Sequence, residues 1–315
     1  MGNVPESRHF RLKELADGIY AAVIVPGTGA WGNAGIVDLG GAALVFDTFL
    51  TPAPARELRA AAETLTGSPV RYVVNSHYHM DHTFGNAEFP DALIVATETT
   101  RDLIAERGRK LLEQVQANPD YLDELEAELR AEPDAARRAD KALELGEWRA
   151  LDGSIAEMTL RLPDITFAER MVFHGSRRRA ELLTYGGGHT PSDAFLYLPA
   201  DRIAFMGDLV PVSTHPSFAG DANEWRRTLE RVEQLDIQTL VPGHGPIGTA
   251  ADATSTRQYI ADLQALAEDV AVRAGGSEDD AAALPIPYEY TDWEAPSVFP
   301  ANMRFLYKHV PTPSE

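Results

Sequence analysis

The chain has 315 residues, a length that fits two domains of ~150 residues or one large α/β unit of ~250 residues with additions. Its 44% hydrophobic and 24% charged residues are typical of a folded globular protein and exclude a disordered one. The net charge of −20 opposes binding to phosphate backbones and anionic lipids, so we expect neither a nucleic-acid nor a membrane partner. Because there is no cysteine, disulfides, thiolate metal ligands and a cysteine nucleophile are excluded.

The start of the chain, from Met1 to His9, has no basic run followed by an apolar stretch, which a secretory signal would show. No apolar run reaches the length of about 18 residues that a membrane-spanning helix needs. We therefore expect a cytoplasmic protein.

The first quarter of the sequence alternates short apolar segments with glycine turns. This pattern predicts strands over 18–25, 34–39, 42–47, 70–74 and 92–96. Thr51 as N-cap and Pro52 at the first helical position predict a helix after the third strand.

Residues 99–150 differ from this pattern and show three consecutive segments with the apolar spacing of a helix. Apolar residues such as Leu111, Leu112 and Val115 share one face, while charged residues cover the others. We interpret this segment as a helical cap inserted over a sandwich core, not as a separate domain.

Strand patterns resume at about Ile155 and run to Met206. A helix opening at Asp221, a strand over 239–241 and a long helix over 252–273 follow. The tail over 276–315 is acidic and then rich in proline and aromatic rings. So many rings predict docking, either on the body of the protein or on a second copy in a homodimer.

Two parts of the chain repeat the order strand, Asp, helix, strand, His. The Asp and His are Asp47 and His77 in the first part, and Asp208 and His244 in the second. Two such halves would pack as two sheets with helices outside. The sequence therefore predicts an α/β (α+β) fold, a four-layer αββα sandwich with these four residues at one rim.

The strongest motif is His77-x-His79-x-Asp81-His82, directly after an apolar strand. Two histidines one residue apart at a strand end point the same way and can bind one metal ion. Asp81 and His82 lie on the turn beyond, where they are offset enough to bind a second ion.

Three further positions at strand ends complete a ligand set. His189 follows three glycines, which allow the backbone to approach an ion closely. Asp208 offers a carboxylate that can bridge two cations, and His244 lies in a tight Pro-Gly-His-Gly turn.

This ordered set resembles the metallo-β-lactamase superfamily, whose fold is the αββα sandwich, over about residues 16–250. The resemblance implies that one metal is held by His77, His79 and His189 and a second by Asp81, His82 and His244, with Asp208 bridging the two. It also implies that Asp47 orients a ligand histidine. The ligands then span both halves, so residues 1–315 are expected to form one domain with a cap and a tail.

Asp208 stands where the best-known secreted β-lactamases carry cysteine, which argues against antibiotic hydrolysis. The pattern is more similar to glyoxalase II, lactonases and other binuclear hydrolases, and the run 82–86 is similar to cyclase and thioesterase-like members of polyketide pathways. The resemblance implies two Zn²⁺ per chain, with iron or manganese as alternatives.

By this resemblance, a hydroxide bridging the metals attacks the carbonyl of a small-molecule ester, thioester, lactone or amide. The expected catalytic residues are Asp81, which would orient the nucleophile and move its proton, and the bridging Asp208. His215, Trp31 and Tyr185 are candidates for lining the substrate pocket, and no motif identifies the substrate.

Other activities occur on the same scaffold. A persulfide-dioxygenase-like oxidoreductase would use one iron, and a polyketide cyclase or lyase would use the metals without adding water. A flavodiiron protein needs a flavin domain for which 315 residues leave no room. A non-enzymatic metal-binding module is less consistent with a ligand set that keeps an open position.

Overall fold

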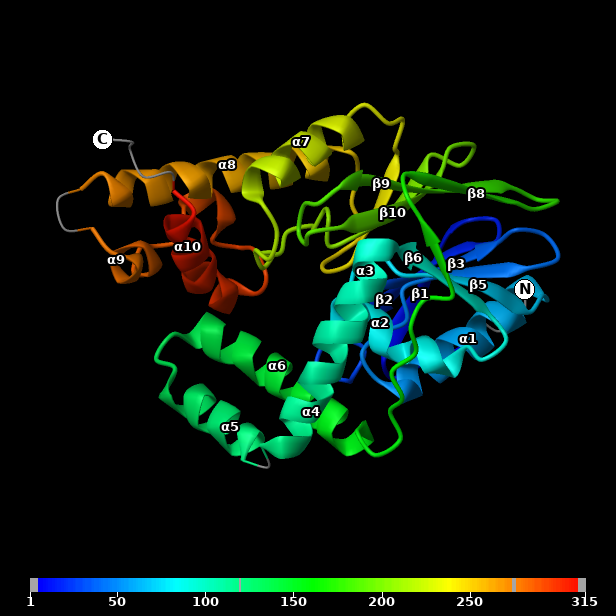
Figure 1. Cartoon of the computed structure of the whole chain (residues 1–315), viewed down its shortest axis with the longest axis horizontal. Helices are drawn as coiled ribbons and strands as arrows, with labels where there is room; N and C mark the ends of the chain where they lie inside the picture. Colours follow the sequence, from blue (N-terminus) through cyan, green and yellow to red (C-terminus); the bar gives the residue numbers. More distant parts are fainter. Residues whose placement is uncertain (1–4, 119, 274–275, 311–315) are drawn as a thin grey trace.

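The computed structural model describes residues 5–118, 120–273 and 276–310, and two β-sheets form its centre (Figure 1). The last residues of the predicted tail, 311–315, lie outside the described residues. The first sheet has the strand order β1-β2-β3-β4-β5-β6-β7. Its strands are β1 (Phe10–Ala16), β2 (Ile19–Ile24), β3 (Ala34–Asp38), β4 (Ala43–Phe46), β5 (Val70–Val74), β6 (Leu93–Thr97) and β7 (Ile165–Phe167).

The second sheet has the order β12-β11-β10-β9-β8. Its strands are β8 (Arg170–His174), β9 (Arg179–Gly186), β10 (Asp193–Leu198), β11 (Ile203–Gly207) and β12 (Thr239–Pro242). Two predictions fail here: β1 was not expected from the sequence, and strands resume at Ile165 instead of Ile155.

The central strands β3 and β4 of the first sheet are buried on both faces, and β4 shows why a strand buried in this way is apolar throughout. Leu44 and Phe46 point into the core between the sheets, while Ala43 and Val45 face helix α1 (Pro52–Thr66). The ring of Phe46 lies 5.8 Å from that of Phe205 on β11, so the two sheets pack directly on each other.

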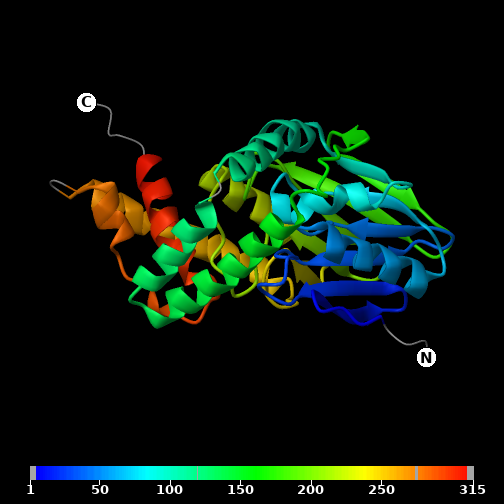
Figure 2. The ribbon, with the colours of Figure 1, turned by 90° about the horizontal axis from the view of Figure 1, so that it is seen from below.

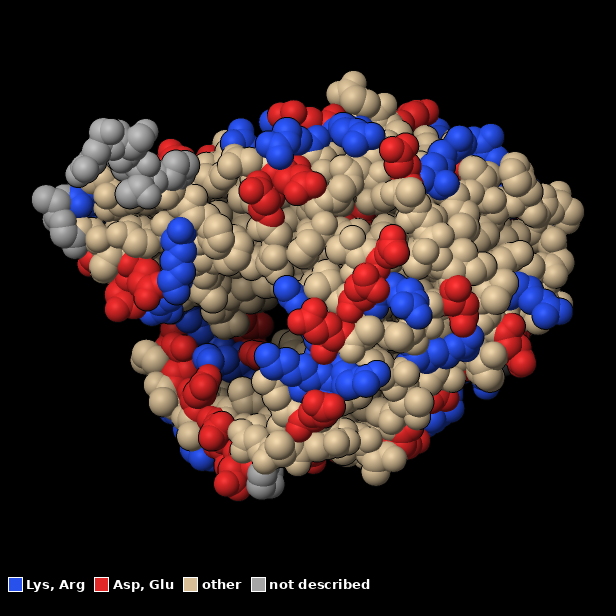
Figure 3. Space-filling view, in the orientation of Figure 1, with Lys and Arg blue, Asp and Glu red and all other residues tan. Residues whose placement is uncertain are grey.

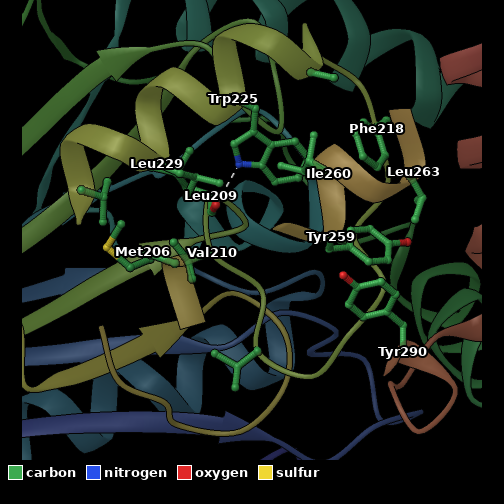
Figure 4. Packing of buried hydrophobic residues seen from close by; sticks show 14 of the residues in the cluster. Met206, Leu209, Val210, Phe218, Trp225, Leu229, Tyr259, Ile260, Leu263 and Tyr290 are labelled. Atoms are coloured by element: carbon green, nitrogen blue, oxygen red, sulfur yellow. Dashed lines mark hydrogen bonds between the residues drawn. The ribbon is translucent and has the colours of Figure 1, made fainter. Parts of the chain in front are cut away.

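Helices α7 (Ala222–Val232) and α8 (Ala251–Ala271) cover the outer face of the second sheet. Trp225 of α7 is fully buried there, and its Nε1 donates a hydrogen bond of 2.9 Å to the carbonyl of Leu209 (Figure 4). The order helix, sheet, sheet, helix confirms the predicted four-layer αββα sandwich.

The predicted repeat is also present as two β-α-β units. In the first unit β4 and β5 are parallel and joined by α1, and in the second β11 and β12 are parallel and joined by α7. Because parallel strands end at the same edge of a sheet, the residues after β4, β5, β11 and β12 meet at one rim.

A short α2 (Met80–Thr83) and a 3₁₀ turn (Phe84–Glu88) follow the first rim loop, and the cap lies between β6 and β7. It consists of α3 (Glu98–Leu103), a π-helical turn (Ile104–Gly108), α4 (Arg109–Ala117), α5 (Tyr121–Ala131) and α6 (Ala135–Ser154). A small apolar cluster that includes Phe84, Val115 and Leu151 joins the cap to the body. The helical insertion predicted over 99–150 is thus found over 98–154.

The C-terminal segment docks on the body of the protein, which was one of the two alternatives predicted for the aromatic tail. It contains α9 (Glu278–Ala282), 3₁₀ turns at Tyr288–Tyr290 and Pro296–Val298, and α10 (Phe299–Lys308). Phe299 and Met303 are buried against α8, and Tyr290 packs edge-on against Tyr259 at 4.9 Å (Figure 4). The segment and the cap lie at the same end of the sandwich (Figure 2).

No helix in the described part of the chain is long and apolar enough to cross a membrane.

Candidate metal centre

Seven histidine and aspartate side chains from strand ends and the loops after them converge at the rim. They are His77, His79, Asp81, His82, His189, Asp208 and His244, and they form two groups. His77, His82 and His189 are almost completely buried, whereas the His244 side chain is one quarter exposed.

The first group contains His77, His79, His189 and Asp208, whose candidate ligand atoms all lie within 4.8 Å of one another. His189 Nε2 is 3.3 Å from Asp208 Oδ2 and 3.0 Å from Nδ1 of His79. Three imidazole nitrogens and one carboxylate oxygen at this spacing are a donor set for one divalent cation.

The second group contains Asp81, His82 and His244. Asp81 Oδ2 lies 3.1 Å from Nε2 of His82 and 3.1 Å from Nε2 of His244. Asp208 also faces this group, because its carboxylate oxygens are 3.3 Å from His82 Nε2 and 3.4 Å from His244 Nε2. Asp208 is therefore placed between the two groups.

Asp47 lies beneath both groups and is fully buried. Its carboxylate accepts hydrogen bonds from His82 Nδ1 at 2.9 Å and from the Ser76 hydroxyl at 2.8 Å. The same hydroxyl lies 2.8 Å from Nδ1 of His77. The Asp47 carboxylate is thus hydrogen-bonded to Nδ1 of His82 directly and is linked to Nδ1 of His77 through the Ser76 hydroxyl. Nε2 of both rings is therefore left available to bind a metal ion.

The atoms left free in this way have no hydrogen-bond partner. Nε2 of His77, Nε2 of His82 and Oδ1 of Asp208 are all buried and unpartnered. Buried polar atoms without partners are costly, and cations bound in the two groups would satisfy all three. The residues present therefore fit divalent metal ions.

The charges of the metal-free site agree with this fit. Burial lowers the pKa of His79 to about 3, with the neighbouring His189 acting in the same direction. Burial alone would raise the pKa of Asp208, but His244 and His82 lower it well below its usual range. Conversely, Asp208 and Asp81 outweigh burial and raise the pKa of His244 to about 10. Metal binding must therefore displace protons from the second group.

Two glycines allow the strands to close around Asp208. A Cβ at Gly243 would overlap Oδ1 of Asp208, and a Cβ at Gly207 would come within 2.6 Å of the Ser76 Cβ. Gly207 also has a positive φ of 53°, a conformation that favours glycine.

The family model of the metallo-beta-lactamase superfamily matches residues 28–244, which contain all seven side chains. The chain belongs to this superfamily. Its fold is also shared with solved structures. A metallo-beta-lactamase from Pontibacter korlensis is 20% identical with a TM-score of 0.58, covering 80% of this chain and 99% of that one. A metallo beta lactamase from Hirschia baltica is 17% identical with a TM-score of 0.58, covering 80% and 98%.

The sequence is also similar to a curated protein that is not named a β-lactamase. The alpha subunit of a 2,4-dinitroanisole O-demethylase from Nocardioides sp. (strain JS1661) is 26% identical over 239 residues. The match covers 74% of this chain and 55% of the relative, so the chain spans about half the length of the curated relative it matches.

In this superfamily member, a cavity of about 290 Å³ opens over the two ligand groups. His79, Asp81, Asp208 and His244 line its floor. Its walls are Trp31, Asp140 and Glu144 of α6, the loop 211–217 after β11, and residues 295–298 of the C-terminal segment. The metal ligands are therefore accessible to a small molecule under the cap.

Two of the three predicted pocket residues line this cavity, namely Trp31 and His215. Trp31 has a positive φ of 64° and packs edge-on against Trp148 of α6 at 5.8 Å. His215 is buried, and its Nδ1 lies 2.9 Å from the Tyr259 hydroxyl.

The prediction for Tyr185 is wrong. Its ring packs against Phe195 and lies under the guanidinium of Arg231, in a separate cavity beside α7. Side chains on a strand alternate between faces, and Tyr185 shares the outer face with Leu183, away from the rim.

Sequence reasoning missed Ser76, Asp140 and Glu144. Ser76 directly precedes the first ligand histidine, so its place in the motif was a usable signal. Asp140 and Glu144 share one helix face by their spacing of four, but nothing in the sequence indicates what that face covers.

Proposed function

We propose that this protein is a dinuclear metal-dependent hydrolase that cleaves a small acyl substrate, that is an ester, thioester, lactone or amide. The observation that carries the proposal is the position of Asp208, whose carboxylate lies 3.3–3.4 Å from histidines of both groups on the floor of an open cavity. A structural metal site is normally closed, whereas this one is accessible.

Two divalent cations held by these residues would supply a water acidified toward neutral pH and would polarise a carbonyl oxygen. Imidazole nitrogens and carboxylate oxygens without thiolate suit zinc, with iron and manganese as alternatives.

The chain's own residues have distinct tasks in this proposal. Asp81 lines the cavity, and His82 and His244 hold its pKa well below the usual range despite burial, so it is ionised and would orient the nucleophile by accepting a hydrogen bond from it. Asp47 and Ser76 fix the rings of His82 and His77. The cap and the C-terminal segment enclose the substrate and exclude bulk water.

A second candidate is hydrolysis of an activated aryl methyl ether to a phenol and methanol. The name of the curated O-demethylase relative favours it, together with the paired rings of Trp31 and Trp148 beside the cavity. Both candidates need the same ligand set, and they differ only in the atom that water attacks.

The test combines a substrate panel with metal analysis of the purified protein. The panel contains lactones, thioesters, aryl esters, a β-lactam, a phosphodiester and 2,4-dinitroanisole, each assayed with wild-type protein and His79→Ala. We expect turnover of at least one acyl substrate, and loss of both turnover and bound metal in the variant. His174→Ala, at a histidine on β8 distant from the rim loops, is the matched control.

Three results would contradict the proposal. Full activity of His79→Ala with unchanged metal content would show that this site neither binds the metal nor carries out the reaction. A single iron with oxygen uptake would favour the dioxygenase-like activity, and a product formed without addition of water would favour a cyclase or lyase. Turnover of 2,4-dinitroanisole alone would select the second candidate.

A further inference from the structure

The cavity over the ligand groups continues into a larger one between α6 and the C-terminal segment. The second cavity has a volume of about 510 Å³ and shares Trp31, Glu144 and Ala295 with the first. Apolar side chains such as Leu143 and Trp293 line much of it. Figure 3 shows the surface hollowed where the cap meets the C-terminal segment.

Outside the candidate metal-ligand residues, the charged groups that line this continuous space are all of one sign. Apart from the metal-ligand carboxylates, the acids that face it are Asp140, Glu144, Glu147, Asp292 and Glu294. Among the described residues, no lysine or arginine lines either cavity. Basic side chains visible at the outer edge of the hollow in Figure 3 do not reach this lining.

Two of the three acids on α6 already have firm partners, and Glu144 is the least engaged of the three. Glu147 accepts hydrogen bonds of 2.5 Å from the amides of Gly27 and Gly29, and Asp140 accepts from Ser297. Glu144 has only a long contact of 3.4 Å with Trp148 Nε1, and burial raises its pKa. Lys141, one turn away, is paired with Glu128 at 3.1 Å.

A second, independent feature of the cavity also lacks a partner. His215 is 2% exposed and lines the wall, and Tyr259 occupies its Nδ1. Its Nε2 is buried with no hydrogen-bond partner in the described structure. Burial lowers the pKa of His215 to about 4, so the ring is neutral and does not repel a cation at pH 7.

One basic residue, Arg107, lies beside the site but is already engaged. Arg107 lines a third cavity, which shares Trp31 and His79 with the first. Its guanidinium stacks on the ring of Tyr78 and donates a hydrogen bond of 2.6 Å to the hydroxyl of that residue.

We propose that the cavity binds a substrate carrying a positively charged nitrogen, with Glu144 and Asp140 near the charge, Trp31 against it, and Nε2 of His215 hydrogen-bonded to a polar atom of the same molecule. This rests on the proposed function for the identity of the reacting bond. Aromatic faces combined with carboxylates are the surroundings that favour organic cations. A carboxylate or sulfonate arm placed between α6 and the C-terminal segment would face these acids, which repel it.

The test uses three small alcohols that differ mainly in charge: choline, its neutral isostere 3,3-dimethylbutan-1-ol, and anionic isethionate. Binding to the purified, metal-loaded protein is measured by calorimetry, so no turnover is needed. We expect choline to bind about tenfold more tightly than the neutral isostere, which corresponds to about 1.4 kcal/mol. Isethionate should not bind measurably.

Variants assign this preference to the cavity. Glu144→Gln keeps the shape of the side chain and should remove most of the preference for choline. Glu63→Gln makes the same charge change at an exposed position on α1 and should leave the preference unchanged. His215→Phe should weaken both choline and the neutral alcohol, because each loses a hydrogen bond.

Equal binding of choline and the neutral isostere, or a preference that survives in Glu144→Gln, would overturn the inference. These outcomes are separate from failure of the proposed function. A protein that prefers choline but hydrolyses nothing would keep the cation site and lose the hydrolase assignment.

Discussion

Asp47 adopts a left-handed backbone conformation with φ of 60° and is completely buried, two conditions that few residue types satisfy together. Aspartate tolerates this conformation, and here its carboxylate accepts hydrogen bonds from the Ser76 amide, the Ser76 hydroxyl and His82. Because Ser76 in turn contacts His77, one side chain orients a histidine in each ligand group.

Replacement of this carboxylate tests its task directly. Asp47→Asn keeps the size and the tolerated backbone but offers one acceptor oxygen fewer to its three donors. We expect the affinity for zinc to fall about 10- to 100-fold with the fold retained. Zinc titration combined with circular dichroism measures both.

Asp38→Asn is the matched control, since Asp38 is also a buried aspartate at a strand end but pairs with Arg177 away from the rim. It should lower stability without changing zinc affinity. Equal zinc affinity in Asp47→Asn and wild type would show that Asp47 has no part in positioning the ligands.

At the scale of elements, the sequence predicted the two β-α-β units because each pairs an apolar strand with a helix that has one apolar face. It also singled out every histidine of the two candidate ligand groups, because each lies at the end of a predicted strand or on the turn beyond it. Strand β1 was missed because it lies at the sheet edge, where only Phe10 of its residues is buried, so it has no continuous apolar run. The direction of the Tyr185 side chain was missed because the sequence does not show which face of β9 points toward the outer helices.

The turn after β12 shows how closely these elements approach. A methyl group at Gly243 would occupy the position of Asp208 Oδ1 and lie 2.9 Å from the Gly207 carbonyl carbon. We expect Gly243→Ala to displace Asp208 and to lower the metal content of the purified protein. Mass spectrometry of the metals measures this change.

Gly153→Ala is the control for this substitution, because it lies in α6 with no atom within 4 Å of the added methyl group. It should leave the metal content unchanged and raise stability by about 0.5–1 kcal/mol. Normal metal content in Gly243→Ala would contradict the tight approach of the turn to Asp208.

At the scale of the whole molecule, the ligands come from both halves of the sandwich, and the cap and C-terminal segment meet above them. The contact between Asp140 and Ser297 joins positions 157 residues apart, and no local pattern could reveal it. The sequence therefore predicted the metal-binding rim, whereas the walls of the cavity that select the substrate depend on long-range packing. Some of the acidic residues behind the net charge of −20 line that cavity, where they favour a cationic substrate in the proposal above.

The central claim is that Asp208 joins two metal positions in one centre. The most direct measurement is the number of zinc ions bound per chain, after dialysis against zinc, by wild type and by Asp208→Ala of confirmed fold. We predict two ions for the wild type and fewer than one for the variant, because both groups lose a ligand. Saturation of the wild type at a single ion, or two ions retained by Asp208→Ala, would contradict it.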